Sequence, residues 1–174
     1  MITAYCPGII ANKETVVKSK EELEHIVPWI WNRNVSLCTG YFAPLHSGHI
    51  EYIEEASRYG DFCIVAVNNN ESLLDKKGLV AIDEEERLRV ISSIRYVDMA
   101  IVFDGETSEL IRLLKPKYFC NGGDRSTMES QNQEEIKACE EIGCKLMLGV
   151  GGSNKRISSS KIIESFVNGW KNGV

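Results

Sequence analysis

The amino-acid sequence predicts an α/β fold, a doubly wound parallel sheet of five strands, with a small N-terminal extension. From residue 35 onward, short apolar runs alternate with amphipathic segments, which implies right-handed strand–helix–strand crossovers. Small, polar and cationic residues also gather after four of the apolar runs, where such sheets bind ligands. We therefore expect one domain over residues 35–174 and an extension over residues 1–34 that packs on this core.

The five expected strands are short and rich in β-branched, aromatic or other apolar residues. The second one, Phe62–Val67, is continuously apolar, as is typical of a strand covered on both faces. A polar stretch over 68–77 follows it and is expected to be a loop. The predicted strands are Val35–Tyr41, Phe62–Val67, Met99–Phe103, Tyr118–Cys120 and Lys145–Val150.

The expected helices carry capping signals at their ends. Asp83 precedes three glutamates that favour the start of a helix, and Gly60 and Gly143 are suited to end the helices before them. The predicted helices are His49–Tyr59, 84–94, Ser108–Leu114, Glu129–Ile142 and Ser158–Val167. In the extension we expect short strands at Ile2–Tyr5, Ile9–Ala11 and Thr15–Lys18, then a helix that Ser19 caps and Pro28 ends or kinks.

The composition excludes several classes of protein. The chain has 174 residues, of which 43% are hydrophobic and 26% charged, with a net charge of -5. It has no long Lys/Arg run, which argues against non-specific nucleic-acid binding, although a local cation cluster still allows a small anionic ligand. No apolar run reaches the roughly 20 residues of a membrane helix, and no signal-peptide pattern is seen. The six cysteines form no C-x-x-C pair, so we expect reduced thiols in a cytoplasmic protein.

Two of the three histidines stand in the segment His46-Ser47-Gly48-His49, which follows the first predicted strand. Gly48 allows the backbone to approach a phosphate closely, and the helix that follows offers unpaired amides and a positive dipole end. Two imidazoles can donate hydrogen bonds to oxygens that gain charge in a transition state. Phosphoryl and nucleotidyl transfers need little more than positioning and charge stabilisation. The segment therefore predicts chemistry on a phosphate, without a nucleophile from the protein.

A second candidate anion site opens the last predicted helix. Ser158, Ser159 and Ser160 are preceded by Lys155 and Arg156. Hydroxyls and the free amides of a first helical turn can hold a phosphate chain, and the two cations add charge. A serine run is also a common helix cap, so the interpretation depends on its lying at the same rim as the histidines.

Together these two motifs resemble the HxGH nucleotidyltransferase superfamily, over about residues 35–167. The segment Arg95-Tyr96-Val97-Asp98 is similar to one in cytidylyltransferases acting on glycerol phosphate and phosphocholine. The segment Asn121-Gly122-Gly123-Asp124 resembles the K-G-G-D loop of heptose-1-phosphate adenylyltransferases. The resemblance implies a Rossmann-like fold and transfer of a nucleoside monophosphate from ATP or CTP to a small phosphorylated sugar or polyol, with release of pyrophosphate. It also implies Mg²⁺ carried on the nucleotide phosphates, no metal held by protein side chains alone, and a homodimer.

The resemblance also implies roles for particular residues. His46 and His49 are expected to stabilise the α-phosphate, with Lys77 (or Lys76) as a mobile-loop lysine on the phosphates and Arg87 as a further phosphate contact. An ion pair on a helix surface is the alternative for Arg87. The nucleotide is expected to contact Tyr41, Phe42, Gly48, Gly122, Gly123, Asp124, Arg125, Ser158, Ser159 and Ser160.

Three departures leave alternatives open. Ala43 stands where the sugar- and glycerol-phosphate enzymes have Asp, Asn121 replaces the Lys of K-G-G-D, and Arg125 is placed to restore that charge. The run from Gly40 to His49 instead looks like nicotinamide mononucleotide adenylyltransferases, which is one alternative. A non-catalytic nucleotide-binding protein is the other. A class I aminoacyl-tRNA synthetase fragment shares the first motif, but the chain has no K-M-S-K-S-like run.

Overall fold

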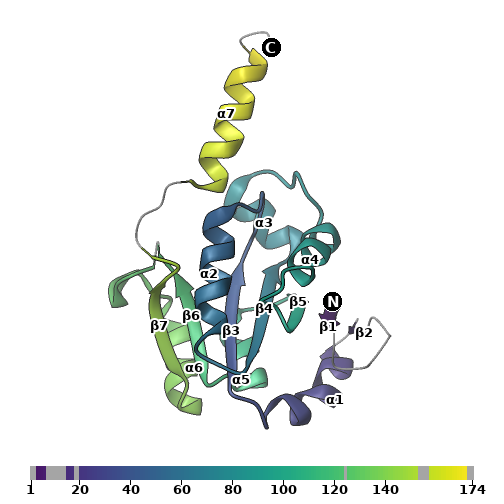
Figure 1. Ribbon diagram of the computed structural model, residues 1–174, viewed down its shortest axis with the longest axis vertical. Helices are drawn as coiled ribbons and strands as arrows, with labels where there is room; N and C mark the ends of the chain where they lie inside the picture. The colour runs from purple at the N-terminus through teal and green to yellow at the C-terminus, as the bar shows by residue number, and fades with distance from the viewer. Residues whose placement is uncertain (1–2, 7–14, 18–19, 124, 153–156, 172–174) are drawn as a thin grey trace.

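The computed structural model describes residues 3–6, 15–17, 20–123, 125–152 and 157–171. Its centre is one seven-stranded sheet with the order β2-β1-β5-β4-β3-β6-β7 (Figure 1). Five strands run parallel in the order β5-β4-β3-β6-β7, and this confirms the predicted doubly wound sheet. They are β3 (Val35–Gly40), β4 (Phe62–Asn68), β5 (Met99–Phe103), β6 (Tyr118–Gly122) and β7 (Lys145–Val150).

The N-terminal residues extend this sheet at one edge. Strand β1 (Thr3–Cys6) pairs antiparallel with β5, and β2 (Thr15–Val17) pairs antiparallel with β1. The predicted strand Ile9–Ala11 and the cap Ser19 lie outside the described residues. Helix α1 (Lys20–Ile30) contains Pro28 and ends two residues after it, so of the two alternatives predicted for this proline, an end of the helix at Pro28 is not observed.

The two faces of the sheet are covered by different helices, because side chains alternate along each strand. In β4, Phe62, Ile64 and Ala66 pack in a core with α1, α5 (Thr107–Leu114) and α6 (Gln133–Ile142). The intervening Cys63, Val65 and Val67 pack in a second core with α2 (Ser47–Ser57) and α4 (Glu84–Ser92). A strand buried on both faces is what its continuous apolar sequence predicts.

Two segments differ from the sequence prediction. Residues expected as a loop form helix α3 (Asn70–Lys77), which Asn69 caps by accepting a hydrogen bond from the Ser72 amide. Gly78 ends this helix in the left-handed conformation, with φ of 71°. Helix α6 begins at Gln133 instead of Glu129, since Asn132 caps it and Met128–Ser130 form a separate 3₁₀ turn. In both places a local asparagine cap fixes the boundary.

The last helix, α7 (Ser159–Lys171), extends away from the sheet and its flanking helices (Figure 1). Its side chains include the strongly exposed Phe166 and Trp170. Cys38, Cys63, Cys120 and Cys139 are buried free thiols, and Cys144 is half-buried. No helix within the described part of the chain has the length and apolar character needed to span a membrane.

Candidate active site at the carboxyl ends of the strands

A cleft of about 450 Å³ lies where β3, β4, β6 and β7 end and where α2 and α7 begin. A parallel sheet places the carboxyl ends of its strands at one rim, so motifs far apart in the sequence meet there. Ala43 also lines the cleft, so no carboxylate occupies that position. The predicted residues that line it are Tyr41, Phe42, His46, Gly48, His49, Lys76, Lys77, Gly122, Gly123, Arg125, Ser158, Ser159 and Ser160. Asp124, Lys155 and Arg156 lie outside the described residues.

The two motif histidines form a stacked pair at the start of α2. Their ring centroids are 3.8 Å apart with an angle of 23° between the planes. The backbone N–H of His46 donates to Nδ1 of His49 at 3.3 Å. A neutral imidazole whose Nδ1 accepts a hydrogen bond carries its proton on Nε2. With Nδ1 as the acceptor of this contact, a neutral His49 can donate a hydrogen bond from Nε2 to a ligand oxygen.

Phe42 orients His49 and is itself only 3% exposed. The two rings meet edge to face with centroids 5.1 Å apart. Phe42 has the unusual φ of 51°, and a Cβ on Gly40 would lie 2.9 Å from the Phe42 ring. Gly40 therefore leaves the space that this ring needs. The structure gives Phe42 a packing contact with His49, beside the nucleotide contact expected from the resemblance.

The serine run lies close to the histidine turn and to the lysines of α3. The Ser159 hydroxyl donates to the carbonyl of Pro44 at 3.0 Å, and Lys77 Nζ donates to the Ser160 hydroxyl at 3.0 Å. These two contacts join residues separated by 115 and 83 positions in the sequence. Lys77 belongs to the last turn of α3, not to a loop. The two predicted anion sites therefore face one cleft.

Glu55 and Tyr52 of α2 hold this rim in place, although no sequence motif indicates a role for them. Glu55 accepts a hydrogen bond from the Gly151 amide at 2.8 Å, which fixes the segment that follows β7. Gly151, with φ of 86°, approaches so closely that a Cβ there would lie 2.7 Å from the Cα of Tyr52. The Tyr52 hydroxyl donates to the Cys120 carbonyl at 2.5 Å and accepts from the Thr39 amide at 3.3 Å. Burial raises the pKa of Tyr52 well above its usual value, so the hydroxyl stays a donor.

Arg87, which the resemblance assigns to a phosphate contact, is only 2% exposed and is not among the residues that line the cleft. Its guanidinium donates to the carbonyls of Tyr41 at 2.8 Å, Asn68 at 2.7 Å and Ile82 at 3.1 Å, and to the Asn70 side chain at 3.0 Å. Burial lowers the pKa of Arg87, and Glu84 and Asp83 partly offset that effect. Arg87 therefore holds the backbone behind the cleft in place, and its burial shows that it is not a surface ion pair. Its phosphate contact stays a prediction.

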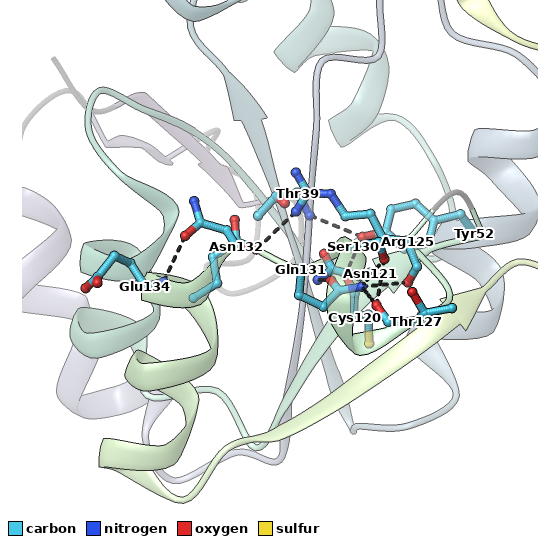
Figure 2. Close-up of polar contacts among 11 residues, drawn as sticks. Thr39, Tyr52, Cys120, Asn121, Arg125, Thr127, Ser130, Gln131, Asn132 and Glu134 are labelled. Atoms are coloured by element: carbon cyan, nitrogen blue, oxygen red, sulfur yellow. Dashed lines mark hydrogen bonds and ion pairs between the residues drawn. The ribbon is translucent and has the colours of Figure 1, made fainter.

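A buried polar network forms the wall of the cleft beside β6 (Figure 2). The Asn121 amide donates to Gln131 Oε1 at 2.6 Å, and Gln131 Nε2 donates to the carbonyls of Arg125 at 3.0 Å and Thr127 at 2.7 Å. Arg125 in turn pairs with Glu135 at 3.0 Å. Neither Gln131 nor Glu135 belongs to a recognisable motif, so no local pattern predicts their place in the site.

The described part of the chain has no group of three or more His, Cys, Asp or Glu side chains arranged to hold a metal ion.

The fold and this cleft define a nucleotidyltransferase-type α/β protein, and comparisons with known proteins agree. Residues 37–165 match the family model described as cytidylyltransferase-like. The chain belongs to this cytidylyltransferase-like family of nucleotidyltransferases.

Relatives and solved structures show the same likeness. The chain is 34% identical over 140 residues to the bifunctional protein HldE of Desulfatibacillum aliphaticivorans, which covers 79% of this chain and 28% of that protein. For HldE of Campylobacter concisus (strain 13826) the identity is 31%, over 87% of this chain and 33% of that protein. The chain thus spans about a quarter to a third of the length of these relatives.

Among solved structures, the lipopolysaccharide core biosynthesis protein from Thermoplasma volcanium GSS1 superposes with a TM-score of 0.57 at 28% identity. That match covers 67% of this chain and 94% of the other. A protein from Archaeoglobus fulgidus shares the fold with a TM-score of 0.52 at 18% identity, over 72% of this chain and 93% of the other.

Proposed function

We propose that the protein transfers a nucleoside monophosphate from ATP or CTP to a small sugar or polyol phosphate and releases pyrophosphate. The observation that carries the proposal is the meeting of two phosphate-binding elements in one cleft. The stacked His46 and His49 form one element, and the contact between Lys77 and Ser160 at 3.0 Å belongs to the other. Both elements offer hydrogen-bond donors or positive charge, which suits a triphosphate.

In this reaction a phosphate oxygen of the acceptor attacks the α-phosphorus of the nucleotide. A new P–O bond forms, the bond from the α-phosphorus to the bridging oxygen breaks, and pyrophosphate leaves with that oxygen. We assign His46 and His49 to the α-phosphate oxygens, where their N–H groups oppose the growing charge. Lys77 and Ser158 to Ser160 are assigned to the β- and γ-phosphates. Tyr41, Gly122, Gly123, Asp124 and Arg125 are assigned to the wall around the nucleoside.

We propose that the nucleotide enters as its Mg²⁺ complex. The ion would supply charge neutralisation on the β- and γ-phosphates, which lowers the cost of separating pyrophosphate. Lys77 and the serine hydroxyls would contact the outer oxygens of the same phosphates.

The first prediction tests the activity directly. With Mg²⁺ and a panel of sugar and polyol phosphates that includes heptose 1-phosphate and glycerol 3-phosphate, we expect pyrophosphate release with ATP or CTP. A coupled phosphate assay measures it, and omission of the acceptor is the control. If no nucleotide and no acceptor gives release above that control, the proposed function is wrong.

A second acceptor class is favoured by one specific observation. Ala43 leaves an apolar side chain where the sugar-phosphate enzymes that the sequence resembles have Asp, and it lines the cleft at 8% exposure. The segment from Gly40 to His49 also resembles nicotinamide mononucleotide adenylyltransferases. Adding nicotinamide mononucleotide to the same acceptor panel separates the two classes, because only one acceptor should give efficient release of pyrophosphate from ATP.

We also propose that the protein is a homodimer that uses the turn between α4 and β5. Arg95 is exposed there, and the Asp98 carboxylate accepts a hydrogen bond from the Cys63 amide at 2.8 Å, which fixes the turn. In sedimentation velocity at micromolar concentration we expect a dimer, and we expect Arg95→Glu to shift the protein toward monomer. A wild-type protein that sediments as a monomer would contradict the proposal.

A further inference from the structure

Glu135 places a carboxylate in the wall of the cleft. It lies in the first turn of α6, is only 5% exposed, and lines the cleft together with Arg125, Asn121 and Thr107. Burial raises the pKa of Glu135, and the neighbouring Arg125 partly offsets this. A buried carboxylate costs stability unless it is paired, and the partner of Glu135 is Arg125, which also lines the cleft. Both members of this ion pair therefore stand at the ligand cleft.

The surroundings hold this carboxylate in one place. Arg125 Nη1 lies 3.0 Å from Oε2 of Glu135, and the Arg125 side chain is 43% exposed whereas that of Glu135 is 7% exposed. The backbone of Arg125 is fixed by Gln131, which also accepts the hydrogen bond of the Asn121 amide (Figure 2). The pairing thus leaves the cation open to solvent and keeps the carboxylate enclosed against the cleft.

The chemistry of this wall differs from that of the rest of the cleft. His46, His49, Lys77 and the serine run offer donors or positive charge, which suit phosphate oxygens. An ionised carboxylate only accepts hydrogen bonds, and it repels phosphate. The ligand group that faces Glu135 must therefore be a donor, and sugar hydroxyls are the donors common to nucleotides and sugar phosphates. In dinucleotide-binding sheets an acidic residue binds a ribose hydroxyl in the same way.

We propose that Glu135 recognises a pair of adjacent sugar hydroxyls on a ligand in this cleft, and so acts as a specificity-determining residue. The choice of ligands rests on the proposed function. The hydroxyls belong either to the ribose of the nucleotide or to the sugar of the acceptor. Both carry the same chemistry, and the experiment distinguishes them.

The test is calorimetric binding to wild type, Glu135→Gln and the matched control Glu134→Gln. Glu134 is the preceding residue of α6, but its side chain is 57% exposed and pairs with Lys137 on the surface. The probes are ATP and CTP, their 2′-deoxy and 3′-deoxy analogues, and heptose 1-phosphate with its monodeoxy derivatives. Because a hydrogen bond to a charged group is involved, we expect Glu135→Gln to weaken one parent ligand about tenfold or more.

The analogues show which hydroxyls are read. The deoxy analogue of the recognised sugar should bind wild type about tenfold more weakly and should lose little more on Glu135→Gln, since the contact is already absent. If only the nucleotides lose affinity, the recognised hydroxyls belong to the ribose. If only the sugar phosphates lose affinity, they belong to the acceptor. Glu134→Gln should bind every ligand as wild type does.

The proposal is overturned if Glu135→Gln binds all parent ligands as tightly as wild type, or if parent and deoxy ligands weaken equally. If Glu135→Gln does not fold, the affinities of wild type for the parent and deoxy ligands decide. Equal binding of the two kinds of ligand by wild type then overturns the proposal. Binding needs no turnover, so these results are independent of the pyrophosphate assay. A protein that discriminates the hydroxyls but releases no pyrophosphate would retain this inference and lose the proposed function.

Discussion

Replacement of His46 by alanine is expected to lower kcat by roughly 100-fold or more, comparable to the loss of one oxyanion donor. The imidazole that is lost stacks on His49 at a centroid distance of 3.8 Å. Its removal takes away one hydrogen-bond donor and also the ring that packs against His49 and helps to orient it. The His46 backbone amide still donates to His49 Nδ1, so this half of the capping box of α2 is retained, and only the contact of the His46 side chain with the His49 backbone is lost. We therefore expect the effect in the chemical step more than in stability.

The matched control for this variant is His25→Ala. His25 is the third histidine of the chain and is exposed on α1, which packs with α5 in the core that lies opposite α2. Steady-state pyrophosphate release with the acceptor found in the panel measures kcat and KM for both variants. His25→Ala should behave as wild type. If His46→Ala also turns over at the wild-type rate, the stacked pair only shapes the start of α2, and its assignment to the α-phosphate fails.

The parts of the fold that the sequence predicted are those governed by short-range patterns. The apolar run at Phe62–Val67 indicated a strand covered on both faces, and the order of runs indicated a doubly wound sheet. Helix α3 was missed because Asn70–Lys77 is mostly polar, with Leu73 as its one buried residue. Its cap Asn69 and its terminator Gly78 were readable signals, but they were outweighed by the absence of an apolar stripe.

The same distinction between local patterns and long-range contacts applies to the candidate site. The histidine and serine motifs were predicted because local sequence encodes them, and the strand order explains why they meet. Glu55 was missed because its partner Gly151 is 96 residues away. The sequence does not show that Glu135 is enclosed, since a helix of this composition exposes most of its acids. The resemblance assigns Arg87 to phosphate, but a guanidinium can donate to phosphate or to carbonyl oxygens, and the sequence does not show that this side chain is buried among carbonyls.

Arg87→Met is therefore the second variant with a large expected effect, and its effect should appear first in stability. Methionine fills similar space but leaves the carbonyls of Tyr41, Asn68 and Ile82 without their donor. Buried groups that lose a charged partner cost about 1–3 kcal/mol each, and water from the cleft can replace part of that. We expect a loss of about 3 kcal/mol in the free energy of unfolding, which corresponds to a fall in Tm of about 6–12 °C for a chain of this size.

The same variant separates two roles for Arg87. Asn70 begins α3 and is also held by Asp83 at 2.7 Å, so a loosened Asn70 shifts the helix that carries Lys77. A structural role thus predicts a lower Tm together with a higher KM for the nucleotide. A direct phosphate contact instead predicts an unchanged Tm and a higher KM alone. Arg89→Met, on the exposed face of the same helix, is the control and should leave both quantities unchanged, because the Arg89 side chain is exposed to solvent. Thermal unfolding with and without saturating ATP then decides between the roles, since a ligand that binds the folded state raises Tm by an amount that grows with its affinity.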